Sequence, residues 1–85
     1  MTYETIKMEI SSNPEYVSII RLTTSGIANK VGFCIDDIED LKVAISEACT
    51  NAIKHSSDDT FTIIYSIMVN GLTIEIIDNG KDQKK

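Results

Sequence analysis

Two polar side chains suited to phosphoryl chemistry stand four residues apart in the second half of the chain. Glu47 offers a carboxylate that can accept a proton, and Asn51 offers an amide oxygen that can bind a hard metal ion. At about 100° per residue, this spacing places them within roughly 40° of each other on a helix. They share one stripe, which His55 prolongs by a further turn. Alone, the pair is more typical of an ordinary solvated helix face.

A second candidate group is Asp78-Asn79-Gly80, which directly follows the apolar run Thr73 to Ile77. A carboxylate at the end of a strand could accept a hydrogen bond from the exocyclic amine of a ligand. Gly80 lacks a Cβ and would let the backbone approach a flat ring. The alternative is a plain turn, because Asp, Asn and Gly are all common turn residues.

The elements that must position these groups begin with a strand and a helix. From Thr2 to Ile10 apolar and polar residues alternate, which is the period of a half-buried strand. Asn13 as N-cap and Pro14 at the first helical position predict a helix that ends at Gly32. Gly26 is a weak point in its interior.

A second helix carries the candidate pair. Asp36, or equally Asp37, provides a capping-box-like start, and the helix runs to about His55. Its apolar arc puts Glu47 and Asn51 at the margin, where side chains meet the edge of a pocket. The apolar residues at helical spacing are Ile38, Leu41, Ile45, Ala48 and Ala52.

The remaining residues predict a hairpin. Thr60 to Val69 is rich in β-branched and aromatic residues, and Leu72 to Ile77 returns after Asn70-Gly71, a signal for a type I′ turn. The expected fold class is α+β, a two-layer α/β sandwich of order β-α-α-β-β with two helices on one face of the sheet. We expect residues 1–85 to form a single domain, of which 81–85 are a polar tail.

Composition narrows the classes of function. With 42% hydrophobic and 25% charged residues the chain is globular, and its net charge of -5 argues against a nucleic-acid ligand. Cys34 and Cys49 lack metal-site or Cys-x-x-Cys spacing, so we expect free thiols in a reducing compartment. No charged leader or long apolar run occurs, which predicts a cytoplasmic protein without a membrane segment.

In their order along the chain, these motifs are similar to a known family. The second helix and Asp78-x-Gly80 resemble the N box and first glycine box of the Bergerat-fold (GHKL, histidine kinase-like) ATPases. Other segments resemble the anti-sigma-factor serine kinases of the RsbW type, and the resemblance covers nearly the whole chain up to Gly80. The matching segments are Pro14 to Val17, Ile20 to Thr23, Ile38 to Lys42 and Ser46 to Ala52.

The resemblance implies a partial Bergerat fold, with ATP and Mg²⁺ as cofactors and a role for each candidate residue. Asn51 matches the Mg²⁺ ligand, and Glu47 matches the catalytic base that would deprotonate a protein serine. Asp78 matches the adenine-reading aspartate, with Gly80 beside it. His55, inside the N box, is interpreted as structural or pocket-lining.

The resemblance also implies partners. A member of this family holds a sigma factor inactive and phosphorylates a serine of an anti-anti-sigma antagonist, and we expect a homodimer. Arg21 matches an arginine used in partner contacts, although it is equally an ordinary exposed arginine. Alternatives are a non-catalytic interaction module with a vestigial pocket, or the ATP-binding half of a sensor histidine kinase. The Pro14 to Thr23 segment argues against the latter.

One part of the family pattern does not occur in this sequence. The family continues into an ATP lid and a second glycine-rich box that wraps the phosphates, whereas no Gly-x-Gly is found here. A fragment, part of a longer protein and a natural short form all explain this. We expect the intact parent to be a kinase, and residues 1–85 alone to bind ATP weakly or not at all.

Overall fold

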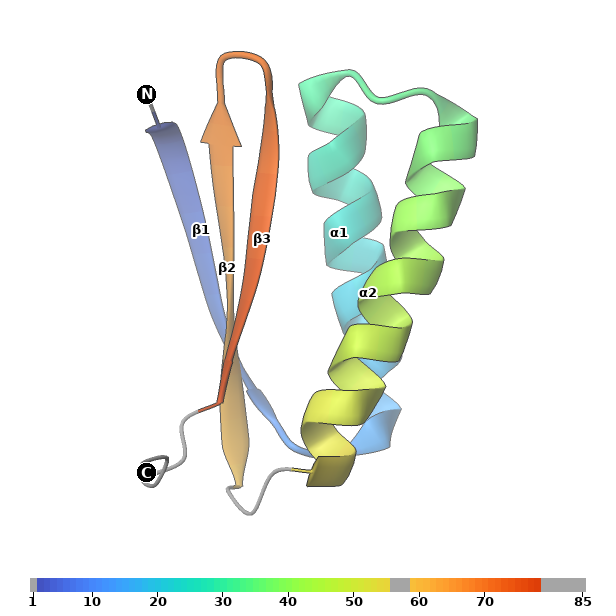
Figure 1. Ribbon diagram of the computed structural model, residues 1–85, viewed down its shortest axis with the longest axis vertical. Helices are drawn as coiled ribbons and strands as arrows, with labels where there is room; N and C mark the ends of the chain where they lie inside the picture. Colours follow the sequence, from blue (N-terminus) through green and yellow to red (C-terminus); the bar gives the residue numbers. More distant parts are fainter. Residues whose placement is uncertain (1, 56–58, 79–85) are drawn as a thin grey trace.

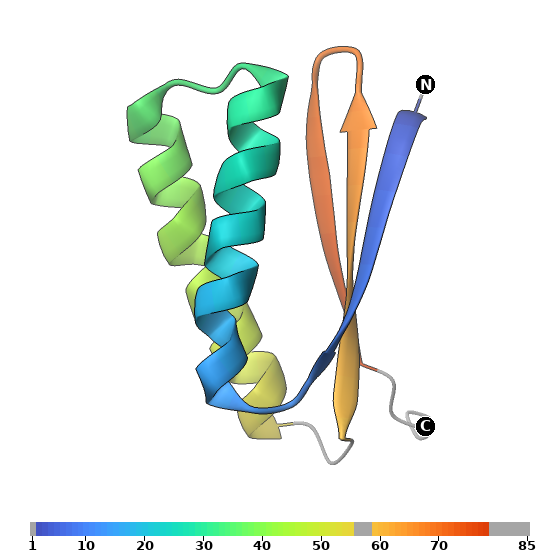
Figure 2. The same cartoon turned by 180° about the vertical axis from the view of Figure 1, so that it is seen from behind.

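The computed structural model describes residues 2–55 and 59–78, which form one sheet and two helices. In order these are β1 (Thr2–Ser11), the 3-10 turn η1 (Pro14–Tyr16), α1 (Val17–Val31), α2 (Ile35–His55), β2 (Thr60–Met68) and β3 (Gly71–Asp78). The strands are antiparallel in the order β1-β2-β3. Both helices cover the same face of this sheet (Figure 1; Figure 2). The predicted α+β sandwich of order β-α-α-β-β is confirmed.

Helix α1 begins and ends close to the predicted residues. Asn13 Oδ1 accepts a hydrogen bond from the Glu15 amide at 3.0 Å, which confirms Asn13 as an N-cap, but the first turn is 3-10 rather than α-helical. At the other end Gly32 has φ 102°. The amides of Gly32 and Phe33 bond back to the carbonyls of Asn29 and Ala28, both at 3.1 Å, which is a Schellman motif.

The two glycines of α1 provide a matched test of backbone conformation. A Cβ would meet no atom within 4 Å at either Gly26 or Gly32, so the two positions differ only in backbone. Gly32→Ala is expected to destabilise the fold by about 1–2 kcal/mol, because φ is positive there. Gly26→Ala is expected to stabilise it by about 0.5–1 kcal/mol, because Gly26 lies inside a helix. Urea unfolding measures both, and equal effects would contradict the assignment.

Helix α2 begins earlier than predicted. Its first residue is Ile35, and the Ile38 amide donates to the Cys34 carbonyl at 3.0 Å. The prediction of Asp36 or Asp37 as N-cap is therefore wrong, and both lie in the first turn. Their negative charge is still favourable there, because the amino end of a helix carries positive partial charge.

The β2–β3 hairpin is confirmed, but the predicted turn is wrong. Met68 pairs with Gly71, so the two-residue loop is Val69-Asn70 and not Asn70-Gly71. Among the described residues only Gly32 has positive φ, which excludes a type I′ turn. The Asn-Gly signal predicted the hairpin correctly and misplaced its loop by one residue.

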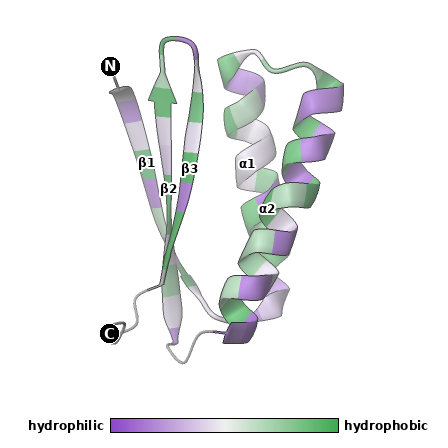
Figure 3. Cartoon of the chain, viewed as in Figure 1, coloured by the Kyte–Doolittle hydropathy of each residue, from purple (hydrophilic) through white to green (hydrophobic). Residues whose placement is uncertain are grey.

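The core lies between β2 and the helices. Phe61, Ile63 and Tyr65 alternate along β2 with 0% exposure and pack against Ile20 of α1 and Cys49 of α2. Figure 3 shows hydrophilic and hydrophobic residues recurring along α2, as expected for a helix with one buried face. The buried side chains of the central strand thus pack together with those of both helices.

A buried hydrogen bond joins α1 to β2 inside this core. Thr24 Oγ1 and Tyr65 Oη are 2.8 Å apart, and both residues have 0% exposure. Tyr65→Phe is expected to cost about 1–3 kcal/mol in free energy of unfolding, because it leaves the Thr24 hydroxyl buried without a partner. The double variant with Thr24→Val should regain part of this loss, since both polar groups are then gone. Additive losses in chemical denaturation would argue against the bond.

Candidate functional site

Glu47 and Asn51 lie together on the exposed side of α2. Both are exposed, and with Ser46 and Thr50 they line an open hollow of about 350 Å³, here called the outer hollow. Ser46 Oγ donates to the Lys42 carbonyl at 2.7 Å, which turns this hydroxyl back onto its own helix. Neither the Glu47 nor the Asn51 side chain hydrogen-bonds another described residue. Their oxygens are therefore available to a ligand.

An apolar slot lies between α2 and β3. It has a volume of about 250 Å³ and is here called the edge slot. Ala48, the neighbour of Glu47, and Ile76 of β3 both line it. The lining residues are Leu41, Ala44, Ile45, Ala48, Ile74 and Ile76. Because alanines stand where larger side chains would fill the gap, a flat apolar group has room there.

Strand β3 ends at the candidate aspartate. Asp78 is its last residue and lies two residues beyond the slot-lining Ile76. In the antiparallel pairing Asp78 stands opposite Phe61 of β2. The end of β3 and the carboxyl end of α2 lie at the same end of the molecule (Figure 1). The fold thus brings Asp78 to the end of the sheet that Asn51 and His55 approach. The other predicted residue of this motif, Gly80, and the tail 81–85 lie outside the described residues.

The remaining two candidates are exposed on different helices. His55 is the last residue of α2, one turn beyond Asn51. Arg21 is exposed on α1, and its neighbour Leu22 is 73% exposed. A largely exposed leucine beside an arginine offers both an apolar and a charged contact. Arg21 belongs to this outward surface of α1.

The edge slot was not predicted from the sequence. The apolar period of α2 includes Ala48 and gives Ala44 no role. Small residues four positions apart are typical of ordinary helix packing and do not by themselves indicate a cavity. The signal that could have found them is their size. Alanine on the side of α2 that faces β3 leaves space, whereas leucine or isoleucine would close it.

The residues that the structure describes do not by themselves build a metal cage. No group of three or more His, Cys, Asp or Glu in ranges 2–55 and 59–78 is arranged to hold an ion. Asn51 can still supply one oxygen, and Mg²⁺ usually combines one or two protein ligands with waters and substrate phosphates. The donor set therefore fits Mg²⁺ only if a phosphate ligand accompanies the ion. No helix in the described part of the chain has the length and apolarity needed to cross a bilayer.

Comparison with known proteins agrees with this arrangement. The family model of the histidine kinase-like ATPase domain matches residues 10–85. Serine-protein kinases RsbW of Bacillus thuringiensis (strain Al Hakam), Bacillus cereus (strain AH820) and Bacillus anthracis are each 48% identical to the chain over 81 residues. The match covers 92% of this chain and 51% of each relative, so the chain spans about half the length of these relatives. The chain belongs to the histidine kinase-like ATPase domain family, and within it is similar to the RsbW serine-protein kinases.

Proposed function

We propose that the full-length protein containing this chain is an ATP-dependent serine-protein kinase and anti-sigma factor. The observation that carries the proposal is the shared outer hollow of Glu47 and Asn51, one residue away from the apolar edge slot. The similarity of the chain to RsbW serine-protein kinases supports the same activity. The site thus combines a carboxylate, an amide oxygen and an apolar slot in one region of α2.

The edge slot suits the adenine ring of ATP. Its lining is aliphatic on both sides, from α2 and from β3, and so can cover the two faces of a flat ring. Asp78 follows the slot-lining Ile76 by two residues and is the proposed acceptor for the adenine amino group. This carboxylate would give the slot its specificity for adenine, because a hydrogen-bonded site rejects rings that lack the matching donor.

The outer hollow suits the phosphates and the reacting serine. Asn51 is the proposed protein ligand of Mg²⁺, which supplies positive charge that neutralises the phosphate oxygens when it is bound. Glu47 is the proposed general base. Its carboxylate takes the proton from the serine Oγ as that oxygen bonds to the γ-phosphorus and the bond to the ADP oxygen breaks. The exposure of Glu47 leaves it accessible to a protein substrate.

The partners are proposed from the same family relation. A sigma factor that is held inactive and an anti-anti-sigma antagonist that is phosphorylated are the expected partners, with a homodimer as the working assembly. Arg21 and the exposed Leu22 on α1 are the proposed contact surface. A non-catalytic interaction module is the alternative, in which the same surface binds a partner without nucleotide.

The edge slot gives a direct test of nucleotide binding. In the full-length protein Ala48→Leu is expected to weaken ATP binding by at least about tenfold, because one lost apolar contact or one clash of this size costs roughly 1–3 kcal/mol. Val43→Leu is the matched control, since Val43 is 58% exposed on the same helix and does not line the slot. Isothermal titration with Mg·ATP measures both. Unchanged affinity in Ala48→Leu would rule out the slot as the adenine site, and no binding by the wild type would favour the interaction module.

A further inference from the structure

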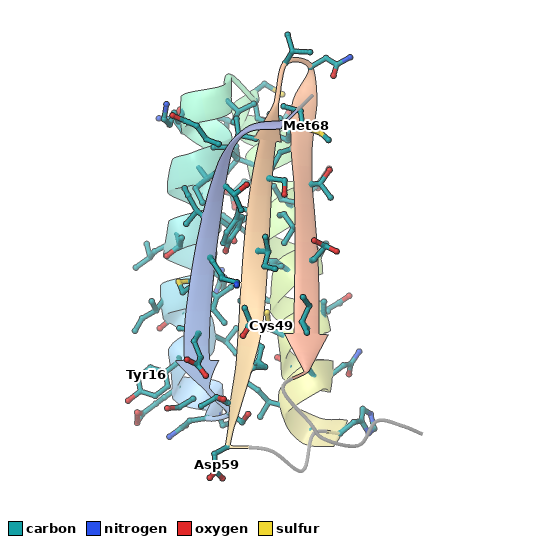
Figure 4. All side chains as sticks on the ribbon, turned by 90° about the vertical axis from the view of Figure 1, so that its left-hand side faces the viewer. Tyr16, Cys49, Asp59 and Met68 are labelled. Atoms are coloured by element: carbon teal, nitrogen blue, oxygen red, sulfur yellow. The ribbon has the colours of Figure 1, made fainter. Side chains whose placement is uncertain are left out.

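One residue in the functional half of α2 is fully buried. The buried residues of α2 are Ile38, Ile45 and Cys49, and of these only Cys49 has 0% exposure. It also lies in sequence between Glu47 and Asn51. Figure 4 shows the sheet in front of the helices and labels Cys49 behind it, on the side of α2. A fully buried side chain of α2 therefore lies in sequence between the two candidate residues.

The position of Cys49 fixes the direction of its neighbours. Glu47 and Asn51 are each two residues away, and two helical steps of about 100° turn a side chain by roughly 200°. Both therefore point almost directly away from Cys49, one on either side of the opposite direction. Any rotation of α2 about its axis that a different side chain at position 49 requires must turn both groups by the same angle.

The core side chains of β2 that pack around Cys49 have little room to move. The thiol belongs to the same core cluster as Phe61 and Tyr65, which lie on the central strand β2. Tyr65 is also held by its hydrogen bond of 2.8 Å to Thr24 of α1. Because close-packed interiors have little free volume, a larger side chain on α2 must displace the helix and not the strand.

Cys49 does not contribute to the site as a reactive nucleophile. Burial raises the pKa of Cys49 to about 11, so the group is neutral near pH 7. A buried neutral thiol is a small apolar group and a poor nucleophile. Its contribution to the site is therefore its size and shape.

We propose that Cys49 is a positioning residue, whose small size lets α2 pack against Tyr65 at the rotation that aims Glu47 and Asn51. The catalytic part of this inference rests on the proposed function. Replacing Cys49 by a larger residue turns the pair away from the nucleotide. Replacing it by alanine keeps the rotation, because a smaller group leaves a small void and requires no displacement.

The rotation of α2 can be measured without reference to activity. Residual dipolar couplings of the α2 amides vary with a period of about 3.6 residues, and the phase of that variation reports rotation about the helix axis. In the full-length protein Cys49→Leu is expected to shift the phase, and Cys49→Val to shift it less. Cys49→Ala should keep the wild-type phase although its melting temperature falls. A wild-type phase in Cys49→Val, or in Cys49→Leu if it folds, would overturn the inference.

Nucleotide binding provides the second readout. The Mg²⁺ concentration needed for half-maximal ATP binding is expected to rise by about tenfold or more in Cys49→Val or Cys49→Leu, the size of effect typical of groups that orient a metal ligand. It should stay within about twofold in Ile38→Ala, a destabilised control that removes a buried α2 residue far from the site. If the wild type binds no Mg·ATP, the proposed function fails, while the dipolar couplings still decide whether the size of the side chain at position 49 controls the helix rotation.

Discussion

Replacement of Glu47 by glutamine in the full-length protein is expected to lower kcat for serine phosphorylation by about 10²–10⁴-fold, the usual contribution of a general base. Glutamine keeps the size of the side chain but cannot accept the serine proton. KM for ATP should change little, because the edge slot and Asn51 are unaltered. Transfer of radiolabelled phosphate to the antagonist under steady-state conditions measures both constants.

The control for this variant is on the same helix. Glu39 is an exposed glutamate of α2 that forms a salt bridge of 3.2 Å with Lys42 at the surface, outside the outer hollow. Exposed pairs of this kind contribute little to stability, so Glu39→Gln should leave kcat within about twofold of the wild type. Glu47→Gln with the kcat of Glu39→Gln would exclude Glu47 as the base.

The second large effect is expected from Asn51→Ala. Loss of the proposed magnesium ligand should reduce phosphoryl transfer by about 100-fold or more, since changes to groups that merely support metal ligands already cost 10–100-fold. The fold should be nearly unaffected, because the Asn51 side chain is exposed and has no hydrogen bond to a described residue. Activity measured over a series of Mg²⁺ concentrations, together with thermal unfolding, separates the two effects.

Asn29→Ala is the matched substitution on α1. Asn29 is also an exposed helical asparagine, and only its backbone carbonyl takes part in the Schellman motif. The side chain can be removed without loss of that bond, so activity and its Mg²⁺ dependence should remain those of the wild type. Retained phosphoryl transfer in Asn51→Ala would remove this residue from the metal site.

Elements defined by a repeating pattern could be predicted from the sequence. The alternation in β1 and β2 and the apolar spacing in α1 and α2 gave the order and layers of the fold, because burial on one face produces those periods directly. The shared stripe of Glu47 and Asn51 follows from the same geometry, and both do line one hollow. Their chemical roles stay predictions.

Features that depend on a single bond or on empty space could not be predicted. Whether α2 begins after Cys34, after Asp36 or after Asp37 depends on which carbonyl the Ile38 amide meets. Local propensity does not decide that contact, since all the alternatives are compatible with the same apolar period. The edge slot was missed for a related reason, because a cavity is defined by atoms from α2 and β3 that are distant in sequence.

The two cysteines differ in exposure, so their reaction with a thiol reagent can report the separation of α2 from the sheet. Cys34 is exposed at the amino end of α2, whereas Cys49 is buried and its pKa is raised to about 11. A thiol reagent at neutral pH should label Cys34 in the native state and reach Cys49 only when α2 separates from the sheet. A fluorophore can thus be attached to the natural sequence at one site, while mass spectrometry of the second thiol records the opening of the helix that carries Glu47 and Asn51.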